Sequence, residues 1–253
     1  MDSGQEMGSK VALVTGASRG IGRAIALELA AAGTTVVVNY FQRREDAETV
    51  VRTVENEGGN ALAYQADVSD RKAVDSMFSM IDDRLGRLDI LVNNAGIASR
   101  IDSITAITDE TWRHTLAVNL DGAFFCLRAA IPRLKAAGRG RIVNISSGAA
   151  LTGGVVGAHY AASKAGLLAL TAKAARELAR DGIAVNAVLP SIIETDMLDE
   201  LARRIGVLDR LRETFPVGRF GRPEEVAQVV RFLCLDAPDY LSGEFISLRG
   251  ARL

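Results

Sequence analysis

The segment KVALVTGASRGIGRAIALELAAA, residues 10–32, decides the fold of this chain. It opens with an apolar run at residues 10–15 whose length and composition suit a buried strand. Glycines at positions 16, 20 and 22 follow, and an Ala/Leu-rich stretch suited to a helix completes the segment. Such a unit is typical of nucleotide binding, because glycines let the backbone approach a pyrophosphate that rests on free amides at the helix start. The alternative is a tight turn with no ligand.

Runs suited to strands alternate with runs suited to helices along the whole chain. This alternation predicts an α/β protein with a doubly wound Rossmann fold, a seven-stranded parallel sheet with helices on both faces. We expect a flexible tail at residues 1–9 and a single domain at residues 10–253. A helical flap is expected near residues 195–221, where the alternative is a plain surface insertion. The strands are expected near residues 10–15, 35–39, 61–65, 88–92, 140–146, 183–189 and 244–248, and the longest helices near residues 109–137 and 158–180.

The composition argues against several classes of partner. The chain has 253 residues, 48% of them apolar, which fits one α/β domain, and no apolar run is long enough to cross a bilayer. A net charge of −1 argues against nucleic acid or an anionic membrane as a partner. The first nine residues are polar, so we expect a cytoplasmic protein. Cys126 and Cys234 are expected as buried small side chains, and with His114 and His159 they lack metal-site spacing, so no metal is expected.

Small and polar residues follow two further strand-like runs. Asp67 and Val68 follow the run at residues 61–65, where they are suited to meet the edge of an adenine ring. The sequence Asn-Asn-Ala-Gly at residues 93–96 follows the run at residues 88–92. In open α/β sheets ligands bind at the carboxyl ends of strands, so we expect these residues and the glycine-rich turn to share one surface. An ordinary turn is the alternative, because Asn and Gly dominate turns.

Tyr160 and Lys164 lie four residues apart in an Ala/Leu-rich run that predicts a helix. Positions i and i+4 share one helix face, so the phenol and the ammonium are expected to project together. A free tyrosine has a pKa of about 10, and a nearby positive charge favours the phenolate and lowers that pKa. A phenol of this kind can exchange a proton with an alcohol or a carbonyl. His159 is expected in the wall of the same pocket.

Further motifs extend this pattern along nearly the whole chain. Asn119 and Ser147 join the motifs already described, and the pattern continues through residues 185–190, 193–197 and 218–227. Together they resemble the short-chain dehydrogenase/reductase family. Within that family the sequence is most similar to bacterial 3-oxoacyl-[acyl-carrier-protein] reductases and related ketoreductases.

The resemblance implies an oxidoreductase that moves a hydride between a nicotinamide and a carbonyl carbon, while Tyr160 exchanges a proton with the oxygen. It implies that Lys164 lowers the tyrosine pKa and holds the nicotinamide ribose, and that Ser147 orients the substrate oxygen. Ser146 competes for that role, but the family's spacing of thirteen residues before the tyrosine selects Ser147. Asn119 is implied to hold a water in a proton relay; without the family it could equally be a solvent-facing helical residue. The expected cofactor-binding residues are Gly16, Ser18, Arg19, Gly20, Ile21, Gly22, Asn39, Arg43, Asp67, Val68, Asn93, Ala95, Gly96, Tyr160, Lys164, Pro190, Ile193 and Thr195.

Charges around the second strand favour NADP(H) over NAD(H). Enzymes that prefer NAD place an acid at the end of this strand to bind the ribose 2′-hydroxyl. Here the strand ends at Asn39, and no acid follows before Glu45. Arg19 in the glycine-rich turn, with Arg43 or Arg44, suits a 2′-phosphate because a guanidinium matches phosphate geometry. The alternative is that Arg43 and Arg44 are the solvated start of the next helix.

Three departures from the family pattern bear on substrate and assembly. Ser191 stands where a glycine is usual and changes the φ preference beside the expected nicotinamide contact. Residues 248–251, Leu-Arg-Gly-Ala, replace the usual Asp-Gly-Gly at a subunit contact, which counts against the implied homotetramer and leaves a dimer open. Residues 137–138, Ala-Gly, and Asp181 stand where carrier-protein reductases present basic residues, which counts against a carrier-bound acyl substrate. The basic residues close by that can compensate are Lys135, Arg139 and Arg180.

Three functions follow from the sequence. The first is an NADPH-dependent ketoreductase that converts a 3-oxoacyl thioester or a related β-keto compound into a secondary alcohol, with acyl carrier protein as a weakened candidate partner. The second is an alcohol dehydrogenase of the same mechanism that oxidises a sugar, a steroid or another secondary alcohol. The third, a nucleotide-binding regulator without turnover, is disfavoured because Ser147, Tyr160 and Lys164 are all present.

Overall fold

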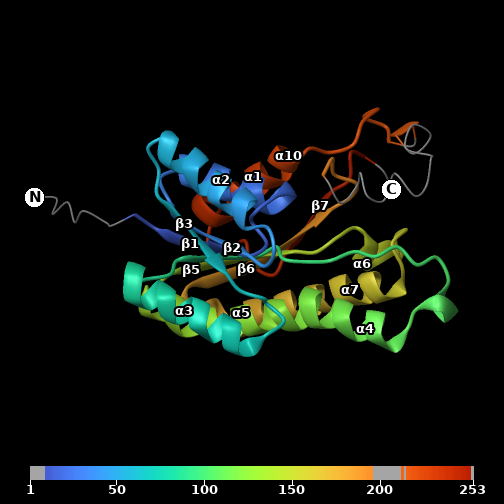
Figure 1. Ribbon diagram of the computed structural model, residues 1–253, viewed down its shortest axis with the longest axis horizontal. Helices are drawn as coiled ribbons and strands as arrows, with labels where there is room; N and C mark the ends of the chain where they lie inside the picture. Colours follow the sequence, from blue (N-terminus) through green and yellow to red (C-terminus); the bar gives the residue numbers. More distant parts are fainter. Residues whose placement is uncertain (1–8, 196–211, 214, 252–253) are drawn as a thin grey trace, which may run out of the picture.

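The computed structural model describes residues 9–195, 212–213 and 215–251, and it confirms the predicted fold. All seven predicted strands form, and they pair in parallel in the order β3-β2-β1-β4-β5-β6-β7, with helices above and below the sheet (Figure 1). The strands are β1 Val11–Val14, β2 Thr35–Tyr40, β3 Ala61–Gln65, β4 Ile90–Asn93, β5 Gly140–Ile145, β6 Ile183–Pro190 and β7 Phe245–Leu248.

Two helical layers cover the sheet. α1, α2 and α10 pack on one face, and α3, α5 and α7 pack on the other (Figure 1). The central strands are therefore buried on both sides, and successive residues of β1 alternate between the two cores: Ala12 and Val14 face the α1 side, whereas Val11 and Leu13 face the α3 side. The helices are α1 Gly20–Ala31, α2 Arg44–Asn56, α3 Arg71–Leu85, α4 Asp109–Leu116, α5 Gly122–Ala136, α6 Ala149–Thr152, α7 Ala158–Leu178 and α10 Pro223–Arg231.

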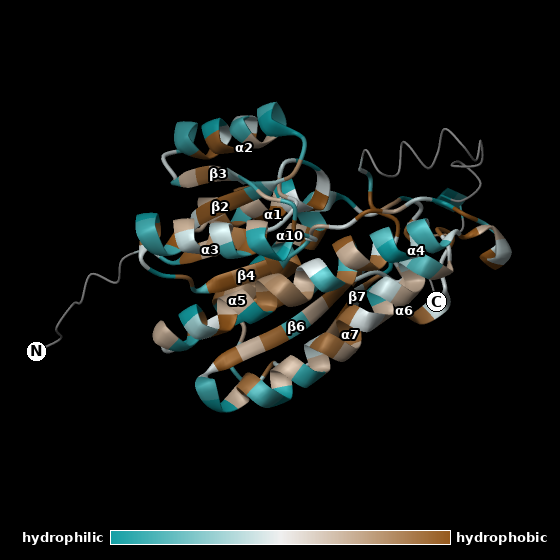
Figure 2. Cartoon of the chain, turned by 60° about the horizontal axis from the view of Figure 1, so that its bottom comes forward, coloured by the Kyte–Doolittle hydropathy of each residue, from teal (hydrophilic) through white to brown (hydrophobic). Residues whose placement is uncertain are grey.

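The outer helices bury one stripe and expose the rest, which Figure 2 shows as mixed brown and teal along each helix over a mostly brown sheet. In α3 the buried residues are Val74, Met77, Phe78 and Ile81. This i, i+3, i+4, i+7 spacing places them on one face of a helix. Burial of that stripe against the sheet, more than helix propensity, holds the element in place.

The strands are added to the sheet first on one side of β1 and then on the other, so the direction of growth across the sheet reverses between β1 and β4. From β1 it runs outward through β2 to β3, then returns to place β4 on the other side of β1. The connections after β1 and β4 therefore diverge at the carboxyl ends of the two strands. A crevice opens at such a reversal, and it is where open α/β sheets bind their ligands.

The helix expected near residues 109–137 is interrupted. α4 ends at Leu116, a π-helical turn spans Ala117–Asp121, and α5 then begins at Gly122. A second π-helical turn, Phe232–Asp236, follows α10. π-helical turns inside α-helices are frequent at functional sites, and Asn119 lies at the centre of the first one.

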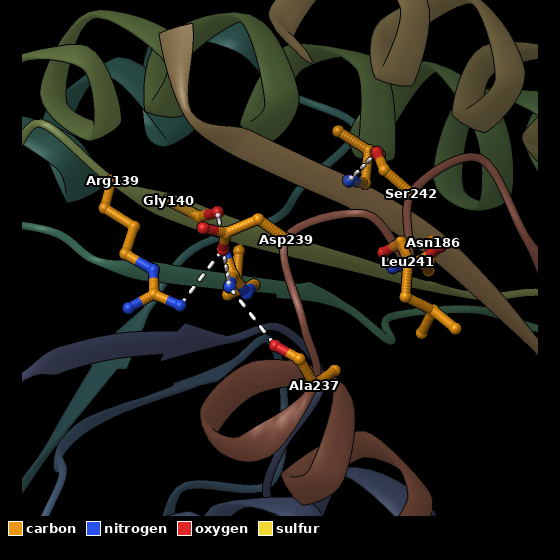
Figure 3. Close-up of polar contacts among 9 residues, drawn as sticks. Arg139, Gly140, Asn186, Ala237, Asp239, Leu241 and Ser242 are labelled. Atoms are coloured by element: carbon orange, nitrogen blue, oxygen red, sulfur yellow. Dashed lines mark hydrogen bonds and ion pairs between the residues drawn. The ribbon is translucent and has the colours of Figure 1, made fainter.

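The loop before β7 is fastened to β5 and β6. Arg141 of β5 is buried and donates to the Asp239 carboxylate at 2.5 Å, and Arg139 donates to the same carboxylate at 3.0 Å. Asn186 of β6 donates from Nδ2 to the Leu241 carbonyl at 2.8 Å. Figure 3 shows these contacts along the loop that leads into the last strand. They fix where β7 begins, and so where its carboxyl end lies.

Two expected segments fall mostly outside the described residues. The tail at residues 1–9 does so except for Ser9, and the flap at residues 195–221 is described only at its two ends. At the second end the buried rings of Phe215 and Phe220 pack edge to face, with centroids 5.5 Å apart. The flap stays a prediction. Within the described part of the chain, no helix is long and apolar enough to cross a membrane.

Candidate active site

A cleft of about 790 Å³ opens at the carboxyl ends of the strands. A volume of this size suits a cofactor with a small substrate. Loops that follow every strand from β1 to β7 contribute to its lining. The expected site residues that it brings together are Gly16, Ser18, Arg19, Gly20, Ile21, Gly22, Asn39, Arg43, Asp67, Val68, Ala95, Gly96, Ser147, Tyr160, Lys164, Pro190, Ile193 and Thr195.

The glycine-rich turn leaves space that any side chain would fill. A Cβ on Gly22 would lie 2.4 Å from both the Gly16 carbonyl oxygen and the Asn94 Nδ2. Gly16 has φ +62°, and its Cβ would lie 2.8 Å from the Ala95 Cα. α1 begins directly after this turn, and its N-cap Arg19 makes no side-chain cap hydrogen bond. The uncapped amides and the close backbone approach fit a pyrophosphate.

Asn39 fastens that turn to the sheet. Its Oδ1 accepts from the Gly16 amide at 3.1 Å, and its Nδ2 donates to the Ala66 carbonyl at 3.1 Å. The side chain is buried, and its amide is engaged with the protein's own backbone. Asn39 lines the cleft, but its side chain positions the loop. The expected contact of Asn39 with the cofactor stays a prediction.

Positive charge gathers at the end of the cleft near β2. Arg19 lies in the glycine-rich turn, and Arg43 precedes α2 with its Nη1 3.3 Å from the Asp46 carboxylate. Asp67 is the one acidic residue among the described residues that line the cleft. Its carboxylate accepts from the Ser69 amide at 2.9 Å and from the Ser69 hydroxyl at 2.7 Å. An anionic group is therefore favoured at this end.

Tyr160, Ser147 and Lys164 converge near the carboxyl end of β5. Ser147 follows the strand, while α7 carries the tyrosine and the lysine. Lys164 is buried, and its Nζ donates to the Ile145 carbonyl at 2.9 Å. The Nζ lies 5.9 Å from the centroid of the Tyr160 ring. A hydrogen bond links Tyr160 to Ser147. The shared helix face expected of positions i and i+4 is thus seen.

The expected lowering of the tyrosine pKa is not seen. Burial raises the pKa of Tyr160 above its usual value of 10.0, and the hydrogen bond from Ser147 opposes this only in part. Burial also lowers the pKa of Lys164 from 10.5 to about 8. Desolvation disfavours the charged form of both groups and is the largest cause of both shifts. Tyr160 is therefore a protonated phenol at neutral pH, which is the form that donates.

Asn119 is buried within the π-helical turn and does not line the cleft. Its Oδ1 accepts from the Ile97 amide at 2.8 Å, and its Nδ2 donates to the Ile97 carbonyl and the Ser163 hydroxyl, both at 3.0 Å. A Cβ on Gly96 would lie 3.3 Å from the Asn119 Oδ1 and 3.3 Å from the Lys164 Nζ. Asn119 thus holds the loop after β4 beside Lys164, and its water relay stays a prediction.

Comparison with known proteins identifies the family. The family model described as enoyl-(acyl carrier protein) reductase matches residues 16–250. The chain is similar to the 3-oxoacyl-[acyl-carrier-protein] reductase FabG of Staphylococcus aureus, 41% identical over 242 residues that cover 96% of this chain and 97% of the relative. A 3-oxoacyl-[acyl-carrier-protein] reductase from a Synechocystis species is 42% identical over 243 residues, 96% of each chain. The chain belongs to the short-chain dehydrogenase/reductase family.

A solved structure agrees with this assignment. A candidate gluconate dehydrogenase from Agrobacterium tumefaciens has a TM-score of 0.91 and 34% sequence identity, with 97% of this chain and 96% of that chain covered. As a short-chain dehydrogenase/reductase, the protein is an oxidoreductase that acts on CH–OH and C=O groups with a nicotinamide cofactor.

Asn93 does not belong to the cofactor surface of this short-chain dehydrogenase/reductase, which corrects the sequence-based expectation. It is the last residue of β4, and its buried Nδ2 donates to the Asn144 Oδ1 at 2.9 Å and to the Ala123 carbonyl at 3.3 Å. The next residue, Asn94, lines the cleft instead and donates to the Thr15 carbonyl at 2.8 Å. Successive side chains in an extended chain point in opposite directions, so neighbouring asparagines differ in whether they line the cleft.

Other expectations about the cleft wall need correction as well. His159 lies outside the wall: it is buried, and its Nε2 lies 3.0 Å from the Ser99 carbonyl oxygen. Ser191 lines the cleft without strain, because its amide donates to the Leu248 carbonyl at 2.9 Å and its φ is not positive. The cleft is also lined by Asn94, which belongs to the motif expected on this surface, and by Ser191 and Arg249, whose roles in a binding site the sequence did not indicate.

Proposed function

We propose that the protein is an NADPH-dependent ketoreductase that reduces a 3-oxoacyl thioester or a related β-keto compound to a secondary alcohol. The buried phenol of Tyr160 carries this proposal. This phenol is protonated at neutral pH, and it lies beside the hydroxyl of Ser147 at the wall of a cleft. That is the protonation state that reduction of a carbonyl requires. Relatives named as 3-oxoacyl reductases support the same direction.

Each residue of the candidate site has its own role in the proposed reaction. A bound nicotinamide supplies the hydride for reduction. Tyr160 donates its proton to the substrate oxygen, and Ser147 donates a hydrogen bond that orients this oxygen and stabilises its developing charge. Lys164, held by the Ile145 carbonyl, is placed to bind ribose hydroxyls and to attract the phenolate that remains. Asn119 keeps the backbone around Ile97 in position beside it.

We propose NADP(H) as the cofactor. Arg19 and Arg43 line the same end of the cleft, and β2 ends without the acid that would bind a ribose 2′-hydroxyl. The Asn39 amide cannot replace that acid, since it is engaged with Gly16 and Ala66. A guanidinium in the glycine-rich turn matches a 2′-phosphate in both charge and geometry.

Acyl carrier protein is proposed as a weak partner at most. Two of the three basic residues near its expected contact are paired within the chain: Lys135 lies 2.9 Å from the Asp181 carboxylate, and Arg139 lies 3.0 Å from that of Asp239. Charges that are neutralised by neighbours attract an acidic partner less. A small thioester or a free β-keto compound fits this surface better.

We also propose that the protein forms a homo-oligomer, a tetramer or a dimer. Trp112 of α4 and Phe124 of α5 are about 40% exposed, and so is Phe245 on β7, the edge strand of the sheet. Exposed aromatic side chains and an unpaired sheet edge are typical of surfaces that another subunit covers.

A second function has one observation in its favour. The similar solved structure is described as a candidate gluconate dehydrogenase, so oxidation of a sugar acid or a related alcohol by the same residues is the alternative. It uses Tyr160 as the proton acceptor instead of the donor. The direction depends on which cofactor form and which substrate the cleft prefers.

One screen tests both functions. Oxidation of NADPH is measured with acetoacetyl thioesters, simple diketones and cyclic ketones, and reduction of NAD⁺ and NADP⁺ is measured with gluconate and neutral polyols. The ketoreductase is supported by turnover of β-keto compounds with NADPH. Turnover confined to alcohols with NAD⁺ contradicts it and establishes the dehydrogenase.

A further inference from the structure

Arg249 places a positive charge in the cleft that no described residue neutralises. It lines the cleft directly after β7. Its Nε is buried and has no hydrogen-bond partner, and none of the ion pairs among the described residues involves Arg249. A buried, unpaired part of a guanidinium is costly unless a ligand satisfies it.

The other positively charged residues of the cleft are accounted for by contacts within the protein or by their place in the proposed cofactor site. Arg100 lies 2.7 Å from the Asp102 carboxylate, Arg43 lies 3.3 Å from that of Asp46, and Lys164 is held by the Ile145 carbonyl. Arg19 belongs to the glycine-rich turn, at the β1 end. Arg249 is therefore the cation whose ligand remains to be identified.

The sheet order places Arg249 at the substrate end of the cleft. The order β2-β1-β4-β5-β6-β7 separates it from Asn39 by five strand spacings, about 24 Å, and from Ser147 by two, about 10 Å. Leu248 pairs with Pro190, so Arg249 follows the strand beside Ser191. The side chain is thus too far to serve the 2′-phosphate, and near enough to hold a group several bonds from the reacting carbonyl.

The turn that follows Arg249 is held in an unusual conformation. Gly250 has φ +56° and Ala251 has φ +63°, and Ala251 is the one described non-glycine residue with a positive φ. Such a conformation is unfavourable for an alanine. A Cβ on Gly250 would lie 2.7 Å from the Val217 side chain, so the turn packs closely against this neighbour. Packing and β-pairing together fix the backbone from which Arg249 extends.

We propose that Arg249 binds a carboxylate of the substrate, so that the preferred substrates are keto acids or hydroxy acids whose carboxylate lies several bonds from the reacting carbon. A guanidinium forms paired hydrogen bonds with the two oxygens of a carboxylate, and the buried Nε would be one of the donors. This inference rests on the proposed ketone–alcohol chemistry but not on its physiological direction.

The test compares a charged ketone with its neutral ester. Reduction of 5-oxohexanoate and of methyl 5-oxohexanoate is measured with saturating NADPH for the full chain and for Arg249→Gln and Arg249→Lys. We expect Arg249→Gln to lower kcat/KM for the acid by about tenfold or more and to change that for the ester by less than about twofold. Arg249→Lys should recover part of the preference, because it keeps the charge. An acid-to-ester ratio that is equal in wild type and Arg249→Gln overturns the proposal.

Further measurements distinguish this proposal from the proposed function, from a structural role of Arg249 and from binding of a phosphate. Calorimetric titration of the NADPH-bound protein with 5-oxohexanoate measures binding without turnover. Binding that is lost in Arg249→Gln supports the proposal even if no ketone is reduced. Absence of reduction by itself contradicts only the proposed function. Size-exclusion chromatography of Arg249→Gln tests for a structural role. Dissociation of the variant with an unchanged acid-to-ester ratio assigns Arg249 to assembly and overturns its role in binding. A larger Arg249-dependent preference for dihydroxyacetone phosphate over dihydroxyacetone would overturn the carboxylate assignment in favour of phosphate.

Discussion

Lys164 donates from Nζ to the carbonyl oxygen of Ile145 at 2.9 Å, which ties the ammonium of α7 to the last residue of β5. The ammonium is buried, and this one backbone contact replaces only part of the water that it loses. Its pKa falls to about 8 for that reason. The candidate active site thus contains a lysine whose charge is destabilised by folding.

Replacing Lys164 should increase stability at neutral pH. Because the pKa of Lys164 is lowered, its buried charge destabilises the folded state below about pH 8. The free energy of unfolding of the wild type therefore rises between about pH 8 and 10.5 as this charge is lost. Lys164→Met removes the charge and the bond to Ile145, with an expected net gain of about 2 kcal/mol at pH 7. Urea unfolding at pH 7 and pH 9.5 measures it. The gain should shrink at the higher pH, and an equal gain at both pH values contradicts the buried charge. Lys173→Met, on the exposed part of α7, is the control and should change stability by less than about 0.5 kcal/mol.

Tyr160→Phe should abolish the reaction and spare cofactor binding. The phenol is the group with a proton to donate, and general acids of this type contribute about 10²–10⁴-fold. We expect kcat for ketone reduction to fall by at least about 100-fold, while the Kd for NADPH, followed by its fluorescence, changes by less than about threefold. Tyr240→Phe, at a fully exposed position, is the matched control. Activity of Tyr160→Phe within tenfold of wild type would exclude Tyr160 as the proton donor.

The pH dependence of reduction should have no acidic limb near neutrality. Burial raises the pKa of Tyr160, so the donor stays protonated throughout the neutral range, whereas Lys164 loses its charge near pH 8. We expect kcat/KM with NADPH to be level between about pH 6 and 7.5 and to decline above about pH 8. A rate that rises steadily from pH 7 to pH 9 would mean that the deprotonated phenol is the active form in reduction.

Charge reversal at Arg19 should discriminate between the two nicotinamide cofactors. Arg19→Glu sets a carboxylate where we place the 2′-phosphate, so the KM for NADPH should rise by at least about tenfold more than the KM for NADH. Arg44→Glu is the control, because Arg44 is exposed, pairs with Glu48 and does not line the cleft. Equal losses with both cofactors would assign Arg19 to the fold of the turn instead of the phosphate.

Removing an internal ion pair should make the protein a better carrier-protein reductase. Asp181→Arg frees Lys135 and adds a positive charge on the same surface. We expect the KM for an acyl carrier protein thioester to fall by about threefold or more, with no change for the same acyl group on N-acetylcysteamine. Glu55→Arg on α2, across the sheet, makes the same charge change as a control. A fall in KM for both thioesters would point to a general effect on the site.

The fold and most of the site could be predicted from the sequence because their signals are local. The glycines of residues 16–22 report a close backbone approach, and strand-like and helix-like runs alternate with their own periods. The four-residue interval between Tyr160 and Lys164 fixes a shared helix face. None of these statements depends on a residue that is distant in the chain.

Tertiary structure alone decided the features that depend on burial and on distant neighbours. The direction of the Tyr160 pKa follows from desolvation, which no local pattern measures. The choice of Asn94 over Asn93 depends on which face of β4 carries α5, and the placement of Arg249 depends on β7 closing the edge of the sheet beside β6. Local spacing determines where a side chain sits on its own element, but its charge state and partners depend on what the other elements bring around it.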